Sequence, residues 1–252
     1  MKKLIVNKER KEMSLGFAAL VYAAVLLLVM VSGYARGLVG SDAVYSADGS
    51  ILINEAVAGA PAWRYFYMFT NQSNLLVLAW LVMYGIGCFV DGRFRRWSRN
   101  NTFMVAVTVY ISITFLIVAF VLEPVYDGTF DPLAGFFTHF STPIIMWFFF
   151  FAVRGTGEVR YRKALFILIY PFCFVILNLI IGATVTGADG KGDYAYGFIN
   201  PNTYPNIAIF VLVIVALTLI FGSFGMLLIK FKKFLGKHYY TQPQAIESDT
   251  VA

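Results

Sequence analysis

A hydroxyl and an imidazole are the groups in this 252-residue sequence whose types and settings could do chemistry together. The hydroxyl belongs to Thr70 in the stretch FTNQSNLL, and the imidazole belongs to His139 in the stretch THFSTP. A hydroxyl is a weak nucleophile at its own pKa, and a histidine within hydrogen-bond reach can activate it as a general base. The two stretches therefore suggest a nucleophile and its base, provided that the fold brings them together.

Both stretches lie in apolar segments that are long enough to cross a membrane. The chain is 59% apolar and 13% charged, with a mean hydropathy of +0.71. About 20 helical residues cross a hydrocarbon core of ~30 Å, so we predict an all-α integral membrane protein with six transmembrane helices. These helices cover residues 15–34, 65–90, 102–122, 134–153, 164–181 and 206–228. The chain then divides into a basic N-terminal segment (1–14), a bundle (15–230) and a tail (231–252) that we expect to be disordered.

The positions of the basic residues predict the orientation of this bundle. Most of the 20 Lys and Arg residues lie in the N-terminal segment, in the second and fourth connections and in the tail. The positive-inside rule then predicts a protein of the cell membrane with both termini in the cytoplasm. Anionic lipid headgroups account for cations at these positions, so the formal charge of +6 does not indicate nucleic-acid binding.

This topology places the two candidate groups at one depth. Thr70 and His139 follow the outer ends of their helices by the same number of residues, roughly 7 Å below the surface. Helical spacing puts Thr70, Ser73 and Asn74 on one face, which must look into the bundle because unpaired polar groups are costly in hydrocarbon. An ionisable residue inside a membrane suggests a functional site.

Other polar residues could assist the pair. Asn74 and Ser73, and less directly Asn71, could donate hydrogen bonds to an oxyanion. Asp131 in the outer connection, or Asn178 near the outer end of helix 164–181, could orient the imidazole. Asn74 and Asn178 could equally form contacts between helices, and Asp131 could be a solvated loop charge.

The sequence indicates no metal site and no other cofactor. His139 is the only histidine in the predicted spans, and its own span holds no cysteine or carboxylate, so a zinc site is not expected. No glycine-rich phosphate loop follows a predicted strand.

The outer connections carry two further patterns. The segment VYSADGSILI has a turn-like Asp48-Gly49 between apolar and β-branched residues, which indicates a small hairpin or a loose loop. The last outer connection holds Tyr194, Tyr196 and Tyr204, which fit an interfacial aromatic belt or a lid.

The stretches FTNQSNLLV and THFSTP, with six spans and cytoplasmic ends, resemble a family of six-span membrane proteins. Its vertebrate members are the androgen-induced and androgen-dependent TFPI-regulating proteins, which hydrolyse fatty acid esters of hydroxy fatty acids. Its bacterial relatives carry a similar F-T-x-x-S-N and H-x-x-x-P, a Tyr-Pro in the fifth span and a Tyr/Gly/Phe-rich last outer loop. Tyr170-Pro171 and the segment YAYGF (194–198) are similar to the last two features.

The resemblance implies a threonine nucleophile at Thr70 and a histidine partner at His139, acting on a membrane lipid or another lipophilic ester. The sequence departs from the vertebrate pattern beside His139, where the vertebrate segment is richer in histidine and this chain has Phe140, Ser141 and Thr142. This departure leaves the substrate open.

Two other classes of function remain open. A small transporter or channel would need polar groups along a path through several spans, whereas the polar residues here gather near one face. A non-enzymatic membrane protein would use the same residues as a structural polar cluster.

Overall fold

The computed structural model describes residues 2–37, 43–45, 51–54, 63–90, 92–122, 132–155, 160–186 and 191–239. Its long helices are α1 (Lys2–Gly37), α3 (Phe69–Gly87), α5 (Asn101–Ile117), α7 (Thr142–Ala152), α8 (Ala164–Thr184) and α9 (Ile207–Tyr239). The shorter helices are α2 (Trp63–Tyr67), α4 (Arg93–Ser98) and α6 (Pro132–Gly135). Single turns are π-helical in η1 (Val118–Leu122) and η3 (Phe136–Ser141), and 3₁₀-helical in η4 (Tyr161–Lys163), η5 (Gly197–Ile199) and η6 (Pro201–Thr203).

Five helices in the described part of the chain are long and apolar enough to cross a membrane. They cover Glu9–Ala35, Asn101–Phe120, Leu133–Ala152, Tyr161–Thr184 and Ile207–Gly236. This agrees with the prediction of a mostly helical membrane protein. The segment expected as a sixth span, 65–90, is not among them, because α3 begins with the polar residues 70–74, which lower its mean hydropathy.

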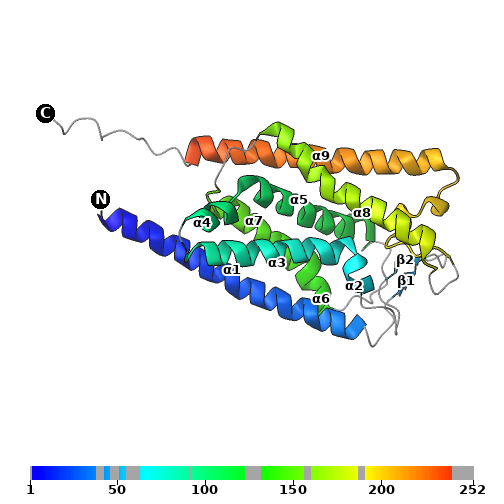
Figure 1. The fold of residues 1–252 in the computed structure, drawn as a ribbon, viewed down its shortest axis with the longest axis horizontal. Helices are drawn as coiled ribbons and strands as arrows, with labels where there is room; N and C mark the ends of the chain where they lie inside the picture. Colours follow the sequence, from blue (N-terminus) through cyan, green and yellow to red (C-terminus); the bar gives the residue numbers. More distant parts are fainter. Residues whose placement is uncertain are drawn as a thin grey trace.

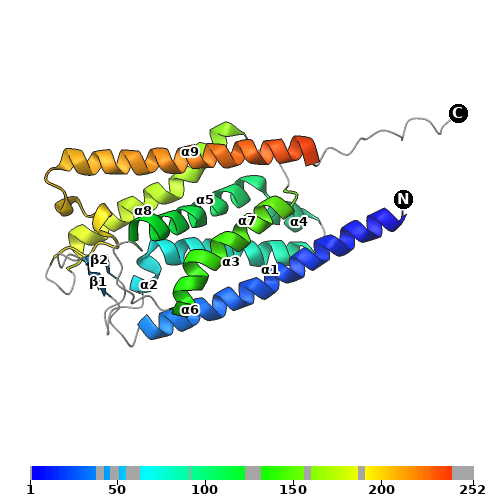
Figure 2. The ribbon, with the colours of Figure 1, turned by 180° about the vertical axis from the view of Figure 1, so that it is seen from behind.

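The helices pack around α5, which contacts α3, α7 and α9. Figures 1 and 2 show α1 along one side of the bundle and α9 along the opposite side, with α3, α5 and α7 between them. One apolar cluster joins α1, α3, α5 and α7, and it contains Trp80 stacked on Tyr84. A second cluster joins α3, α5, α8 and α9, and it contains Phe69, Phe174 and Phe221.

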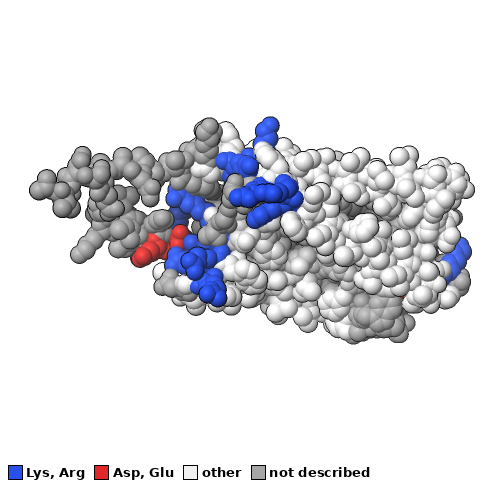
Figure 3. Space-filling model, turned by 45° about the horizontal axis from the view of Figure 1, so that its top comes forward, with Lys and Arg blue, Asp and Glu red and all other residues white. Residues whose placement is uncertain are grey.

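The two ends of the bundle differ in character. α1 begins and α9 ends at the same end, where α4 also lies (Figure 1). Lys and Arg side chains gather at this end, as Figure 3 shows, and Glu12 of α1 pairs there with Arg95 at 2.7 Å and Arg99 at 3.3 Å. The other end carries strands β1 (Ala43–Tyr45) and β2 (Ile51–Asn54). They pair antiparallel, which favours the hairpin over the loose loop, and the predicted turn at Asp48-Gly49 lies outside the described residues.

Helix α8 continues through Pro171 because another helix replaces the missing hydrogen bond. A proline has no backbone N–H, so the carbonyl of Ile167 one turn earlier loses its donor within α8. The buried hydroxyl of Tyr110 on α5 donates to that carbonyl oxygen at 2.9 Å. Such replacement makes a proline tolerable in an apolar helix.

Lys232 supplies donors to the end of α7. Its ammonium group donates to the carbonyl oxygens of Phe150 and Val153, the latter at 2.9 Å, and lies 4.7 Å from the centre of the Phe150 ring. The carbonyls at a helix C-terminus have no partner within the helix. Lys232 belongs to the segment 231–252 that the sequence predicts to be a disordered tail. The structure differs, because α9 continues through Tyr239 and Lys232 is only 4% exposed.

Glycines allow α1 and α3 to approach closely. A Cβ atom added to Gly16 would lie 2.5 Å from the Cβ of Cys88, and one added to Gly85 would lie 2.5 Å from Cγ of Leu20. Small residues at such crossings let helices pack where no hydrophobic force drives them together.

We expect Gly16→Ala to destabilise the bundle by about 1–3 kcal/mol, because the added methyl group overlaps Cys88. The matched control is Gly222→Ala, whose methyl group would meet Leu168 at an ordinary 3.7 Å. That control should be neutral or slightly stabilising, since alanine favours a helix over glycine by roughly 1 kcal/mol. Thermal unfolding of both variants in detergent tests this expectation. Equal melting temperatures would contradict the close α1–α3 contact.

We expect Lys232→Met to lower the free energy of unfolding by about 2 kcal/mol, because two buried carbonyls lose a charged donor. Lys230→Met, at an exposed position on the same helix, removes the same charge and serves as the control. Chemical unfolding in mixed micelles measures both variants. If both substitutions change the free energy of unfolding equally, Lys232 contributes only its charge, and the hydrogen bonds to the end of α7 add no stability.

Candidate functional site

A helix break places Thr70 at the start of α3. The backbone is extended at Met68, with φ −76° and ψ 134°, so α2 ends at Tyr67 and α3 begins at Phe69. The sequence suggests one unbroken helix from residue 65, and the structure differs. The side-chain amide of Asn71 donates to the Tyr65 carbonyl oxygen at 2.7 Å and so bridges the break. The N–H groups of the first turn of α3 lack partners within the helix.

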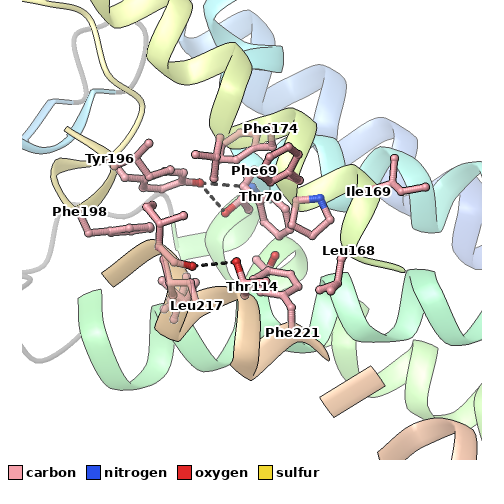
Figure 4. A pocket seen from close by; sticks show the side chains of 18 of the residues that line it. Phe69, Thr70, Thr114, Leu168, Ile169, Phe174, Tyr196, Phe198, Leu217 and Phe221 are labelled. Atoms are coloured by element: carbon pink, nitrogen blue, oxygen red, sulfur yellow. Dashed lines mark hydrogen bonds between the residues drawn. The ribbon is translucent and has the colours of Figure 1, made fainter. Parts of the chain in front are cut away.

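Thr70 meets a tyrosine from the connection between α8 and α9. The N–H of Thr70 donates to the hydroxyl oxygen of Tyr196 at 3.4 Å, and Thr70 Oγ1 lies 3.5 Å from the same oxygen. Figure 4 shows the phenol of Tyr196 pointing at Thr70. Tyr196 is only 4% exposed, so this polar contact is shielded from the outside of the bundle.

Both residues line an apolar cavity of about 350 Å³ between α3, α5, α8, α9 and the 191–199 connection. The cavity follows α8 from Leu165 to Val175, a length of ~15 Å at ~1.5 Å per residue. Two of its wall residues, Leu165 and Phe172, are 68% and 59% exposed on the outer surface of the bundle. The cavity therefore lies against the surface that would face lipid, and the residues with hydroxyl groups in its lining include Thr70, Thr114 and Tyr196.

Ser73 and Asn74 use their donor groups to hold helices together. The Ser73 hydroxyl donates to the Thr70 carbonyl oxygen at 2.9 Å and lies 2.9 Å from the Thr114 hydroxyl of α5. The Asn74 amide donates to the carbonyl oxygens of Thr70 at 2.9 Å and Thr138 at 3.0 Å. Both side chains are buried, as predicted for the polar face. Asn74 Oδ1 is also buried and accepts no hydrogen bond from the described residues.

His139 lies in the π-helical turn η3 and is 7% exposed. In this turn the N–H of Thr142 donates to the Phe137 carbonyl oxygen, five residues earlier. One residue further on, the same pattern would need a hydrogen bond from the N–H of residue 143 to the Thr138 carbonyl oxygen. Residue 143 is a proline and has no N–H, so the Asn74 side-chain amide donates to that oxygen instead. The two stretches FTNQSN and THFSTP therefore meet through Asn74 and Thr138.

The structure does not bring the proposed nucleophile and base into direct contact. Within the described residues, no hydrogen bond joins Thr70 to His139, and His139 is not among the residues that line the cavity. Tyr196 is the group beside the Thr70 hydroxyl. From the sequence, Tyr196 is expected only in an aromatic belt or a lid. Its occurrence in YAYGF near an otherwise apolar segment was the available signal.

The two candidates for orienting His139 have different outcomes. The Asn178 amide donates to the Phe174 carbonyl oxygen at 3.0 Å, and its oxygen accepts from the Ala195 N–H at 3.1 Å. Asn178 thus holds the connection between α8 and α9 that carries Tyr196. Asp131 lies outside the described residues.

Within the part of the chain that the structure describes, no three His, Cys, Asp or Glu residues gather in a group that could hold a metal ion. No protein family, curated protein or solved structure matches the chain.

We expect Asn178→Leu, which keeps the side-chain size and removes both hydrogen bonds, to loosen the 191–199 connection. An unpaired N–H at Ala195 should cost about 1–3 kcal/mol of local stability. Hydrogen exchange at Ala195 and proteolysis of the connection should both become faster. The control, Thr184→Val, removes one side-chain bond to the Ile180 carbonyl at an exposed turn of the same helix. Unchanged exchange at Ala195 in Asn178→Leu would show that the contact does not hold the connection.

Proposed function

We propose that the protein is a membrane-embedded hydrolase of lipid esters with Thr70 as its nucleophile. The observation that carries this proposal is the position of Thr70, in contact with Tyr196, on the wall of a long apolar cavity beside the surface of the bundle. Ligand pockets are mostly apolar with a few placed polar groups, and this cavity has that form. Its length of ~15 Å equals one leaflet of a ~30 Å core, which suits an acyl chain entering from the bilayer.

The proposed membrane topology has six spans, with α3 as the second. The apolar part of α3 runs beside α1 and α5, and it reaches the end of the bundle that carries α4 (Figure 1). α1 begins and α9 ends where Lys and Arg gather (Figure 3). The positive-inside rule supports cytoplasmic termini in the cell membrane, with Thr70 toward the outer leaflet.

In the proposed reaction, Thr70 Oγ attacks the ester carbonyl carbon and His139 takes the threonine proton. The leaving alkoxide receives that proton, and water then releases the acid from the acyl-threonine. Catalytic hydrogen bonds often tighten only when substrate is bound, so the separation of Thr70 and His139 without substrate is compatible with this role. The Asn74–Thr138 bond keeps the two turns in contact. The resemblance to the six-span ester hydrolases supports the same assignment.

A second candidate function is structural, and the bonds of Ser73 and Asn74 favour it. These side chains join α3 to α5 at Thr114 and to η3 at Thr138. A polar cluster that only holds helices together would need no activated hydroxyl at Thr70.

A fluorophosphonate probe distinguishes the two candidates. We expect the purified full-length protein in detergent to be labelled at Thr70, as located by peptide mass spectrometry. Thr70→Val should abolish the labelling, and His139→Gln should slow it by about 10²–10⁴-fold, the usual contribution of a general base.

Thr108→Val is the matched control, because it removes another buried threonine hydroxyl, which among the described residues bonds only the Met104 carbonyl of its own helix. The Thr108→Val variant should be labelled at the same rate as the unmodified protein. Labelling that survives Thr70→Val would place the nucleophile elsewhere. A folded protein that takes up no label would favour the structural candidate.

A further inference from the structure

Tyr196 is held in place by the structure around it. The Ala195 N–H bonds Asn178, and the Asp193 N–H donates to the Val185 carbonyl oxygen at 2.9 Å, so the chain on its N-terminal side is tied to the outer end of α8. The Tyr196 ring stacks on Phe198 with centroids 5.1 Å apart and contacts Phe174. A side chain fixed in this way keeps its hydroxyl at one place, which is what a preorganised donor requires.

The Tyr196 hydroxyl lies next to the proposed nucleophile, Thr70. The same phenol oxygen lies 3.4 Å from the N–H nitrogen and 3.5 Å from the hydroxyl oxygen of Thr70. Because the phenol oxygen is this close to Thr70 Oγ1, an ester carbonyl oxygen held at the nucleophile would come within hydrogen-bond reach of the Tyr196 O–H, as an oxyanion donor requires. Thr70 is also in the first turn of α3, where the helix dipole favours negative charge.

The donors suggested by the sequence are committed to other acceptors. Each of the three side chains donates to backbone carbonyl oxygens: Asn71 to Tyr65, Ser73 to Thr70, and Asn74 to Thr70 and Thr138. A developing oxyanion next to Thr70 therefore needs a donor from another element, and Tyr196 reaches Thr70 from across the cavity (Figure 4).

We propose that Tyr196 is a further catalytic residue, which donates a hydrogen bond to the ester carbonyl oxygen as Thr70 attacks. This inference rests on the proposed ester hydrolysis. The carbonyl oxygen gains negative charge when the Thr70 Oγ–carbon bond forms, and the Tyr196 O–H stabilises that charge. The Thr70 N–H donates to the phenol oxygen and so strengthens the phenol as a donor. Tyr196 keeps its proton throughout, and the charge returns to the carbon–oxygen double bond when the alkoxide leaves with the threonine proton.

The test compares Tyr196→Phe with Tyr194→Phe in the purified full-length protein. Both variants lose one phenol oxygen from the same connection, but the ring of Tyr194 packs against Gly182 on α8, and no hydrogen bond of its hydroxyl joins Thr70. With p-nitrophenyl palmitate as the substrate, Tyr196→Phe should lower kcat by about 10²–10³-fold with little change in KM, as loss of one oxyanion donor does. Tyr194→Phe should keep the original kcat.

A second measurement covers the case in which Tyr196→Phe does not fold. Incorporation of 3-fluorotyrosine at position 196 keeps the shape and makes the phenol a stronger donor, so kcat should rise and its pH profile should shift. An active protein whose kcat is unchanged by both replacements overturns the role of Tyr196 while ester hydrolysis stands. A folded unmodified protein that neither hydrolyses the ester nor is labelled at Thr70 overturns both proposals.

Discussion

The structure depends on one constraint: a backbone carbonyl freed inside an apolar bundle must find a donor on another element. Pro171 frees the carbonyl of Ile167, and Tyr110 supplies the hydrogen bond. The π-helical turn before Pro143 leaves the Thr138 carbonyl open, and Asn74 supplies the donor. In water such carbonyls would bond solvent, whereas in an apolar interior each unpaired group costs several kcal/mol.

The polar residues of α3 fall into two groups, those that satisfy backbone or side-chain groups of other elements and Thr70. Asn71, Ser73 and Asn74 repair helix ends and join α3 to its neighbours. Thr70 is different, because its hydroxyl faces the apolar cavity and meets only the phenol of Tyr196 among the described residues. The helix break at Met68 explains this difference. Because α3 begins at Phe69, Thr70 lies in its first turn, whereas Ser73 and Asn74 lie in the following turn inside the bundle.

The candidate site could be predicted from the sequence only in part. Thr70 was identified because a hydroxyl in a polar stretch inside an apolar segment is unusual, and the structure places it on the cavity wall. The partnership of Asn178 with Ala195 could not be foreseen, since it joins a helix to a connection whose path no helical period defines. The contact of Tyr196 with Thr70 could not be foreseen either, because the same connection holds Tyr194 and Tyr204, and nothing in the sequence distinguishes the three tyrosines.

The sequence alone determined the helical class, most helix positions and the gathering of Lys and Arg at one end, because these follow from composition and local periodicity. Only the tertiary structure decided that Lys232 is buried at the end of α7, that α3 begins after a break at Met68, and that Tyr196 rather than His139 meets the Thr70 hydroxyl. These outcomes depend on which carbonyls and hydroxyls come within ~3 Å of a donor across the bundle, and that distance is set by packing between segments far apart in the chain.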